Sequence, residues 1–275
     1  MLNKETIKKI NDYVYKEPRT IQEISQLIKK NWRTADSYVE KIKDEEGTLT
    51  TKTFRGGTKG ALKIVYWNNI EKIHSNSFQE RLFSKIENAK DKEDFSPFEL
   101  FQHIEENKRH ARAWYQNSEE DALPKFLRKT EKELLCFSGN LSWINAKGIL
   151  KILEELLKHN TEIRIISRID IASIKNIQRL IELENKLGKK LIDIRHSEQP
   201  LRGFIQDSKI TRLTEIKDPN KYRFDELKKQ VMIDYEIKDP EWNQWLEKVF
   251  FNMFRNSIGY EKRIKDLKTI EKLEP

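Results

Sequence analysis

Apolar residues recur at helical spacing in three windows near the amino end of the chain: residues 5–15, 20–28 and 32–46. Each window repeats an apolar side chain every three or four positions, so each predicted helix has one face to bury. Thr20 precedes the second window and Glu23 follows three residues later, which is the spacing of a capping box. Residues 29–31 leave room for only a short turn. The pattern therefore predicts three packed helices, with the last two forming a helix-turn-helix.

Two β-rich runs follow these helices, LTTKTF from Leu49 and ALKIVYW from Ala61. The segment RGGTKG joins them, and its three glycines permit the positive φ angles of a tight turn. The two runs predict an antiparallel hairpin placed directly after a helix-turn-helix. Residues 1–69 are accordingly predicted to form a winged helix-turn-helix domain.

Positive charge is concentrated in this first domain. The whole chain carries +8, and residues 1–69 hold 14 Lys and Arg against 9 Asp and Glu, a net +5. Such a patch is the electrostatic footprint of nucleic-acid binding, and the second helix of such modules reads base edges near its amino end. DNA contacts are expected from helix and wing side chains: Trp32, Arg33, Thr34, Ser37 and Lys41, then Arg55 and Lys59. The alternative is a winged helix that binds another protein.

A helical connector is predicted over residues 70–124. An apolar stripe runs from Ile70 to Ile86 at roughly helical spacing. It could pair with its copy in a homodimer or pack within its own chain. A second helix is predicted from Pro97 to Trp114, with Ser96 as its cap.

Strands and helices alternate from Glu133 onward, which predicts βαβ units and a mainly parallel sheet within residues 125–275. A hairpin is expected with its turn at Asp207–Ser208. The last predicted helix begins after Asp239, carries an aromatic stripe and ends at Gly259. That stripe predicts core packing, with a dimer surface as the alternative. The fold class is therefore α/β, or α+β for the chain as a whole.

Several classes of chemistry lack their sequence signature. The sequence contains no P-loop, GxGxxG, HExxH, GxSxG or EF-hand motif, and its five histidines are dispersed. The single cysteine, Cys136, excludes an internal disulfide and lies in an apolar strand, where a buried thiol is expected. No apolar run is long enough to span a membrane, and the amino end lacks the apolar core of a signal peptide. We expect a cytoplasmic protein without a metal, cofactor or membrane partner.

The second domain resembles the phospholipase D fold through ELLCFSGNLSWIN and IRHSEQPLRGFIQDSKITRLTEIKDP. More closely, it resembles the effector domain of the archaeal TrmB-type transcription regulators, which join a winged helix to such a domain. Active phospholipase D relatives carry HxKxxxxD, in which the histidine is the nucleophile and the lysine holds the phosphate. Aligned on Asp207, this chain has Pro200 at the histidine and Arg202 at the lysine. The resemblance therefore implies the fold without the hydrolase, since proline offers no nucleophile.

Arg195, Arg202 and Arg212 are the candidate ligand-binding residues, since they occupy three strands that are predicted to be adjacent. If they converge, they could hold an anion with bidentate geometry. The alternative is that each pairs with a nearby carboxylate at the surface: Glu198, Asp207 or Glu215.

The combined prediction is a non-enzymatic, sequence-specific transcription regulator that binds double-stranded DNA as a homodimer. Its second domain is expected to sense a small anionic or, as the resemblance implies, sugar-like effector, or to mediate assembly. Two alternatives are a DNA-targeted phosphodiesterase or nuclease, and a protein-binding adaptor of the transcription or repair machinery.

Overall fold

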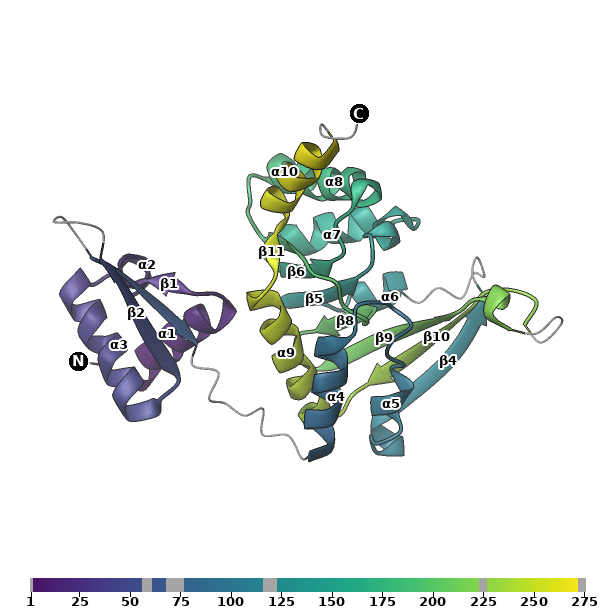
Figure 1. The fold of residues 1–275 in the computed structure, drawn as a ribbon, viewed down its shortest axis with the longest axis horizontal. Coiled ribbons are helices and arrows are strands. Elements are labelled where there is room, and N and C mark those ends of the chain that lie inside the picture. The colour runs from purple at the N-terminus through teal and green to yellow at the C-terminus, as the bar shows by residue number, and fades with distance from the viewer. Residues whose placement is uncertain (1, 56–60, 68–76, 116–122, 223–226, 272–275) are drawn as a thin grey trace. The chain divides into compact units, whose positions relative to one another are not determined.

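A computed structural model describes residues 2–55, 61–67, 77–115, 123–222 and 227–271. The chain divides into two compact units, Met1–Ser75 and Asn76–Pro275. Figure 1 shows the helices and strands of each unit. Both units combine helices with β-structure, which confirms the predicted α/β fold class.

The first unit contains three helices and a three-stranded sheet in the order β1-β3-β2. The elements are α1 (Lys4–Lys16), β1 (Arg19–Thr20), α2 (Ile21–Ile28), α3 (Trp32–Glu46), β2 (Leu49–Arg55) and β3 (Ala61–Trp67). Strands β2 and β3 are antiparallel from Leu49 opposite Trp67 to Arg55 opposite Ala61. One apolar core joins the three helices to the sheet, with Ile10, Ile24 and Val39 fully buried. The three predicted helices and the hairpin are confirmed.

Local hydrogen bonds define the helix-turn-helix. Thr20 and Glu23 form the predicted capping box at the start of α2, where the Thr20 N–H donates to the Glu23 carboxylate at 2.7 Å. Helix α2 ends at Lys29, which adopts the left-handed conformation. Asn31 then caps α3 by accepting the N–H of Thr34 at 2.8 Å. Two caps separated by a single residue enforce the sharp crossing of the two helices.

The second unit contains an eight-stranded sheet in the order β11-β7-β6-β5-β8-β9-β10-β4 (Figure 1). Its strands are β4 (Arg109–Tyr115), β5 (Glu133–Ser138), β6 (Glu162–Ser167), β7 (Ile192–His196), β8 (Gly203–Gln206), β9 (Ile210–Lys217), β10 (Val231–Ile237) and β11 (Ile258–Gly259). Its α-helices within the described residues are α4 (Ser77–Asn88), α5 (Phe98–Phe101), α6 (Leu123–Leu127), α7 (Ile149–Lys158), α8 (Ile171–Leu187), α9 (Pro240–Arg255) and α10 (Tyr260–Glu271). Short 3-10 helices lie at Glu106–Lys108, Ser142–Asn145 and Pro219–Lys221.

Helices cover both faces of this sheet. Successive side chains of a strand point to opposite faces, so each strand contributes to two cores. Leu134 and Cys136 join a core with residues of α7 and α8. Phe137 belongs to the other face, where its ring meets that of Phe250 on α9 at a centroid distance of 5.1 Å. The result is a helix-sheet-helix arrangement that buries the central strand β5 completely from Leu134 to Phe137.

The predicted hairpin closes at Asp207–Ser208, which confirms the turn. Both residues have positive φ, 51° and 56°, as the central residues of a type I′ turn require, and the Lys209 N–H closes the turn by donating to the Gln206 carbonyl at 2.9 Å. The Asp207 carboxylate accepts the backbone N–H groups of Glu131, Lys132 and Glu133 at 2.8–3.0 Å. The aspartate therefore ties the hairpin to the start of β5.

Three predictions about the second unit are wrong. The sheet is not mainly parallel: within the described residues only β5 with β6 and β6 with β7 are parallel pairs. The predicted helix from Pro97 stops at Phe101, and Arg109–Tyr115 is instead an edge strand antiparallel to β10. The last predicted helix ends at Arg255, after which Gly259 lies in β11 and a further helix, α10, follows.

Two apolar stripes that were candidate dimer surfaces are buried within the chain. On α4, Leu82 and Ile86 are 3% and 0% exposed, while Ile70 lies outside the described residues. On α9, Trp245, Val249 and Phe250 are at most 3% exposed. The stripes thus serve core packing, and the homodimer stays a prediction that needs another surface. Across the described part of the chain, no helix combines the length and apolar character needed to cross a membrane.

Candidate nucleic-acid interface and ligand site

The outward face of α3 carries the predicted DNA-reading residues. Arg33, Ser37 and Lys41 follow one another at four-residue intervals, so they lie on one side of the helix, and all three are exposed. No described residue forms a salt bridge with Arg33 or Lys41, and both side chains can extend into solvent. Trp32 is 44% exposed at the first position of the helix. The predicted residues are thus brought together, with Thr34 half-buried beside the helix cap.

Charge changes sign along α3. Exposed basic residues occupy its amino-terminal side, where Lys29 and Lys30 precede Arg33. Its last turn is acidic and exposed over residues 44–46. A polyanion would therefore meet attraction at the amino end of α3 and repulsion at the carboxyl end, which matches the end that recognition helices present to base edges.

Lys63 of the wing strand β3 fixes the hairpin against α3. Its ammonium pairs with Asp36 at 2.5 Å and with Glu40 at 2.7 Å, and its side chain is 15% exposed. Burial alone would lower the pKa of Lys63, but hydrogen bonds to the two carboxylates outweigh that effect and raise it. The pairing also neutralises the two acidic side chains in the middle of α3. The wing residues Arg55 and Lys59 were also predicted to contact DNA, but the side chain of Arg55 and all of Lys59 lie outside the described residues.

Arg212 is committed to an internal carboxylate in the second unit. Asp234 on β10 is 3% exposed and forms an ion pair with the Arg212 guanidinium. The same carboxylate accepts from Arg112 at 3.0 Å, from the Trp114 indole N–H at 2.8 Å and from the Thr214 hydroxyl at 2.8 Å. This buried network of side chains from β4, β9 and β10 leaves Arg212 no role in holding an external anion.

Arg195 is likewise engaged, on a distant strand. It pairs with Asp193 at 3.1 Å, donates to the carbonyl of Phe254 at 3.2 Å and stacks over the Phe254 ring. Strand β7 is separated from β9 by β6, β5 and β8, with about 4.8 Å between neighbouring strands. The predicted convergence of Arg195, Arg202 and Arg212 is therefore wrong. The alternative was correct in kind for Arg195 and Arg212, although their partners are Asp193 and Asp234.

Arg202 lies at a different cationic cluster, which sequence reasoning missed. The Lys92 ammonium reaches across the ends of two strands and donates to the carbonyl oxygens of Leu201 at 2.6 Å and Ser138 at 3.2 Å. Burial, followed by the neighbouring Arg202 cation, lowers the pKa of Lys92 to about 7, and Arg168 adds to this effect. Glu198 is the nearby acid that opposes it. Lys92, Arg168 and Arg202 therefore replace the predicted trio as the positive charges gathered at one edge of the sheet.

Side chains around Pro200 are structural. Gln199 is 1% exposed, and its amide donates to the Ser138 carbonyl at 2.9 Å and accepts the Leu201 N–H at 2.7 Å. His196 is near this edge, but its Nδ1 accepts the N–H of Ile169 at 2.9 Å, and burial lowers its pKa. Cys136 is fully buried, and that burial raises the pKa of its thiol, in keeping with the expected inert cysteine. Within the described residues, no group of three potential metal ligands is present.

No family model and no curated protein matches this chain. Among solved structures, the phospholipase D family member Nuc from Salmonella typhimurium is 12% identical with a TM-score of 0.42, over 56% of this chain and 99% of that one. TrmBL2, described as an archaeal chromatin protein with a novel mode of DNA binding, is 12% identical with a TM-score of 0.41, over 93% of this chain and 94% of that one. The phosphatidylserine synthase of Haemophilus influenzae is 14% identical with a TM-score of 0.42, over 55% and 39%. Similarity at this level assigns neither a family nor an activity.

Proposed function

We propose that this protein is a sequence-specific, double-stranded-DNA-binding transcription regulator whose second unit is non-catalytic and senses a ligand or mediates assembly. The observation that carries the proposal is the exposed face of α3, where Arg33, Ser37 and Lys41 stand in line without a competing described carboxylate. Lys63 also supports DNA binding by α3, because it forms ion pairs with Asp36 and Glu40, which would otherwise repel phosphates. Base-edge and phosphate contacts both become available from one rigid helix.

The non-catalytic half of the proposal is supported by the strand-end chemistry. The position that would hold a nucleophile is Pro200, and the buried Gln199 beside it is bonded to the backbone on both sides. Arg202 and Arg168 remain suited to an anionic group, because a guanidinium can grip a phosphate or carboxylate without reacting with it. Binding without turnover is the behaviour that these side chains favour.

A salt titration tests the DNA-binding half. The full chain is mixed with a random fluorescent duplex, and binding is followed by anisotropy at several salt concentrations. A DNA reader should lose affinity steeply as salt rises, since each neutralised phosphate contributes about −0.9 to the slope of log K against log salt. Selection of bound duplexes from a random pool then reveals whether one sequence is preferred.

Matched variants separate the possible outcomes. Lys41→Ala should lower the salt slope by about one unit. Lys265→Ala removes one exposed lysine from α10 of the second unit and should leave the slope unchanged. If Lys41→Ala and Lys265→Ala behaved alike, or if binding were insensitive to salt, α3 would not be a DNA-reading helix and the adaptor alternative would replace it. Turnover of a phosphodiester substrate that Arg202→Ala abolishes would instead favour the nuclease.

A further inference from the structure

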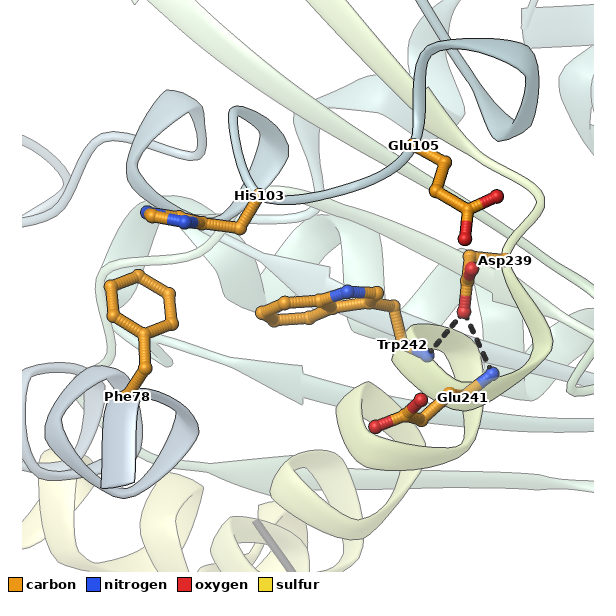
Figure 2. A pocket seen from close by; sticks show the side chains of 6 residues that line it. All are labelled: Phe78, His103, Glu105, Asp239, Glu241 and Trp242. Atoms are coloured by element: carbon orange, nitrogen blue, oxygen red, sulfur yellow. Dashed lines mark hydrogen bonds between the residues drawn. The ribbon is translucent and has the colours of Figure 1, made fainter. Parts of the chain in front are cut away.

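A pocket of about 350 Å³ lies in the second unit, and none of the three basic residues Lys92, Arg168 and Arg202 lines it (Figure 2). Three segments build it: the start of α4, the segment after α5 and the start of α9. Its lining residues are Phe78, His103, Glu105, Asp239, Glu241 and Trp242. The volume is at the small end of the range for pockets that hold low-molecular-weight ligands.

Aromatic rings form one side of this pocket. The rings of Phe78 and His103 are in contact, with their centroids 3.8 Å apart. The guanidinium of Arg81 stands 5.7 Å from the Phe78 ring, so a cation already occupies one approach to it. In Figure 2 the Trp242 indole lies between these rings and the carboxylates of Glu105 and Asp239.

Trp242 has an unused donor. The residue is only 8% exposed and no described residue accepts its indole N–H, but the nitrogen itself keeps contact with solvent. Figure 2 shows the indole nitrogen on the ring edge that faces the segment carrying His103 and Glu105. Because this donor is open to solvent and uncommitted within the described residues, it is available to an acceptor on a bound ligand.

Carboxylates form the other side of the pocket. One oxygen of Asp239 caps α9 by accepting the backbone N–H groups of Glu241 at 2.9 Å and Trp242 at 3.1 Å. Its other oxygen shares the Lys108 ammonium with Glu105, at 3.1 Å in each pair. The Glu241 carboxylate pairs with no described residue, and its side chain is exposed where it lines the pocket. Three carboxylates therefore stand against two cations, Lys108 between Glu105 and Asp239 and Arg81 beside Phe78, which leaves the pocket net anionic in a chain of net charge +8.

We propose that this pocket binds a small organic cation, an ammonium or guanidinium compound that also carries a hydrogen-bond acceptor. The positive group would lie between the aromatic face of Trp242 and the Glu241 carboxylate, where cation–π attraction and a charge-assisted hydrogen bond reinforce each other. The acceptor would take the indole N–H. An anion is excluded from the same place by the three carboxylates. The inference goes beyond DNA binding and holds whether or not the first unit binds DNA.

Calorimetric titration of the full chain tests this assignment with three probes: choline, agmatine and glucose. Choline supplies a quaternary ammonium and a hydroxyl, agmatine supplies a guanidinium, and glucose is the neutral, hydroxyl-rich control. Binding of at least one cation and no binding of glucose is the expected result. Glu241→Gln keeps the size of the side chain, removes its charge and should weaken cation binding roughly tenfold.

Two further variants make the result specific. Glu182→Gln removes an exposed carboxylate from α8 and should leave cation binding unchanged. Trp242→Phe keeps an aromatic face but removes the N–H, so it should weaken choline more than a cation without an acceptor, such as tetramethylammonium. Thermal unfolding of each variant confirms that the second unit is folded. Absence of cation binding, equal affinity in Glu241→Gln and Glu182→Gln, or binding of glucose alone would each overturn the proposal.

Discussion

Basic side chains lie in opposite environments in the two units. On α3, Arg33 and Lys41 are exposed and no described residue pairs with them. In the second unit, Arg212 and Arg195 are buried or nearly so, and each is held by an aspartate of its own or a neighbouring strand. The same residue type is thus exposed and available to an external anion in one place and a structural cross-link in the other. The burial of each side chain and its ion-pair partners distinguish these two environments, and neither can be read directly from the sequence.

Loss of the internal carboxylate should have the largest effect on stability. Asp234→Asn leaves the buried Arg212 guanidinium without its counter-charge, and removing one partner of a buried pair costs about 3–5 kcal/mol. Urea denaturation of the second unit measures this. The control, Glu236→Gln on the same strand, breaks a pair with the exposed Lys238 and should cost less than about 1 kcal/mol. Equal costs for the two variants would remove the contrast drawn between the units.

The second-largest effect concerns DNA binding, where substitution of an exposed arginine and of an ion-paired arginine should have different consequences. Arg33→Ala should weaken binding to a preferred duplex by about 1–3 kcal/mol and broaden the sequences selected. Arg195→Ala removes the same charge from the second unit and should leave duplex affinity within twofold of the unaltered chain. Anisotropy titrations at fixed salt measure both. A larger loss from Arg195→Ala than from Arg33→Ala would reverse the assignment of roles.

Lys92 should make the stability of the second unit depend on pH. Its pKa in the folded chain is lowered to about 7, whereas an unfolded lysine titrates near 10.4. Between these values the unfolded chain holds more protons, so stability should rise with pH, by up to about 1.4 kcal/mol per unit. Denaturation at pH 7.5 and pH 9 measures the slope, and Lys92→Met should flatten it. Lys209→Met, at a side chain that is 70% exposed, is the control, and an equal change of slope there would contradict the role of burial.

The smallest expected effect concerns the tether between wing and helix. Lys63→Met removes two ion pairs from a side chain that is 15% exposed and should destabilise the first unit by about 1 kcal/mol. It also frees Asp36 and Glu40, so duplex affinity should fall although Lys63 itself is not expected to contact DNA. Thermal unfolding and anisotropy measure the two effects. Unchanged affinity in Lys63→Met would show that the two carboxylates do not face the bound duplex.

Most of the first unit could be predicted from local sequence patterns. The capping box at Thr20 and Glu23, the short turn and the line of Arg33, Ser37 and Lys41 all depend on neighbours within a few residues, and the structure contains each of them. The Asp207–Ser208 turn was predictable for the same reason. The aspartate itself does more than close the turn, because it also binds backbone N–H groups at residues 131–133.

Distant pairings were not predictable in this way. Arg109–Tyr115 is rich in basic residues and lies between segments with a helical pattern. It forms a strand because it pairs with β10, which begins only at Val231 in the sequence. Lys92 lies in a charged stretch that is typical of a solvated loop. No neighbouring residue in the sequence indicates that its ammonium donates to the Leu201 carbonyl. The aromatic and acidic pocket likewise combines three separate segments. Each of these features exists only after the sheet has formed.

The pairing of β4 with β10 also has a consequence for the order of events during synthesis. Every strand of the first unit has its partner by residue 67, so that unit can fold while the ribosome is still adding the second. Strand β4 has been synthesised by residue 115, but its partner β10 follows only at residues 231–237. During that interval its unpaired edge is open to other chains, and closure of so long a loop slows folding. The first unit can thus be complete before strand β4 of the second unit has its partner.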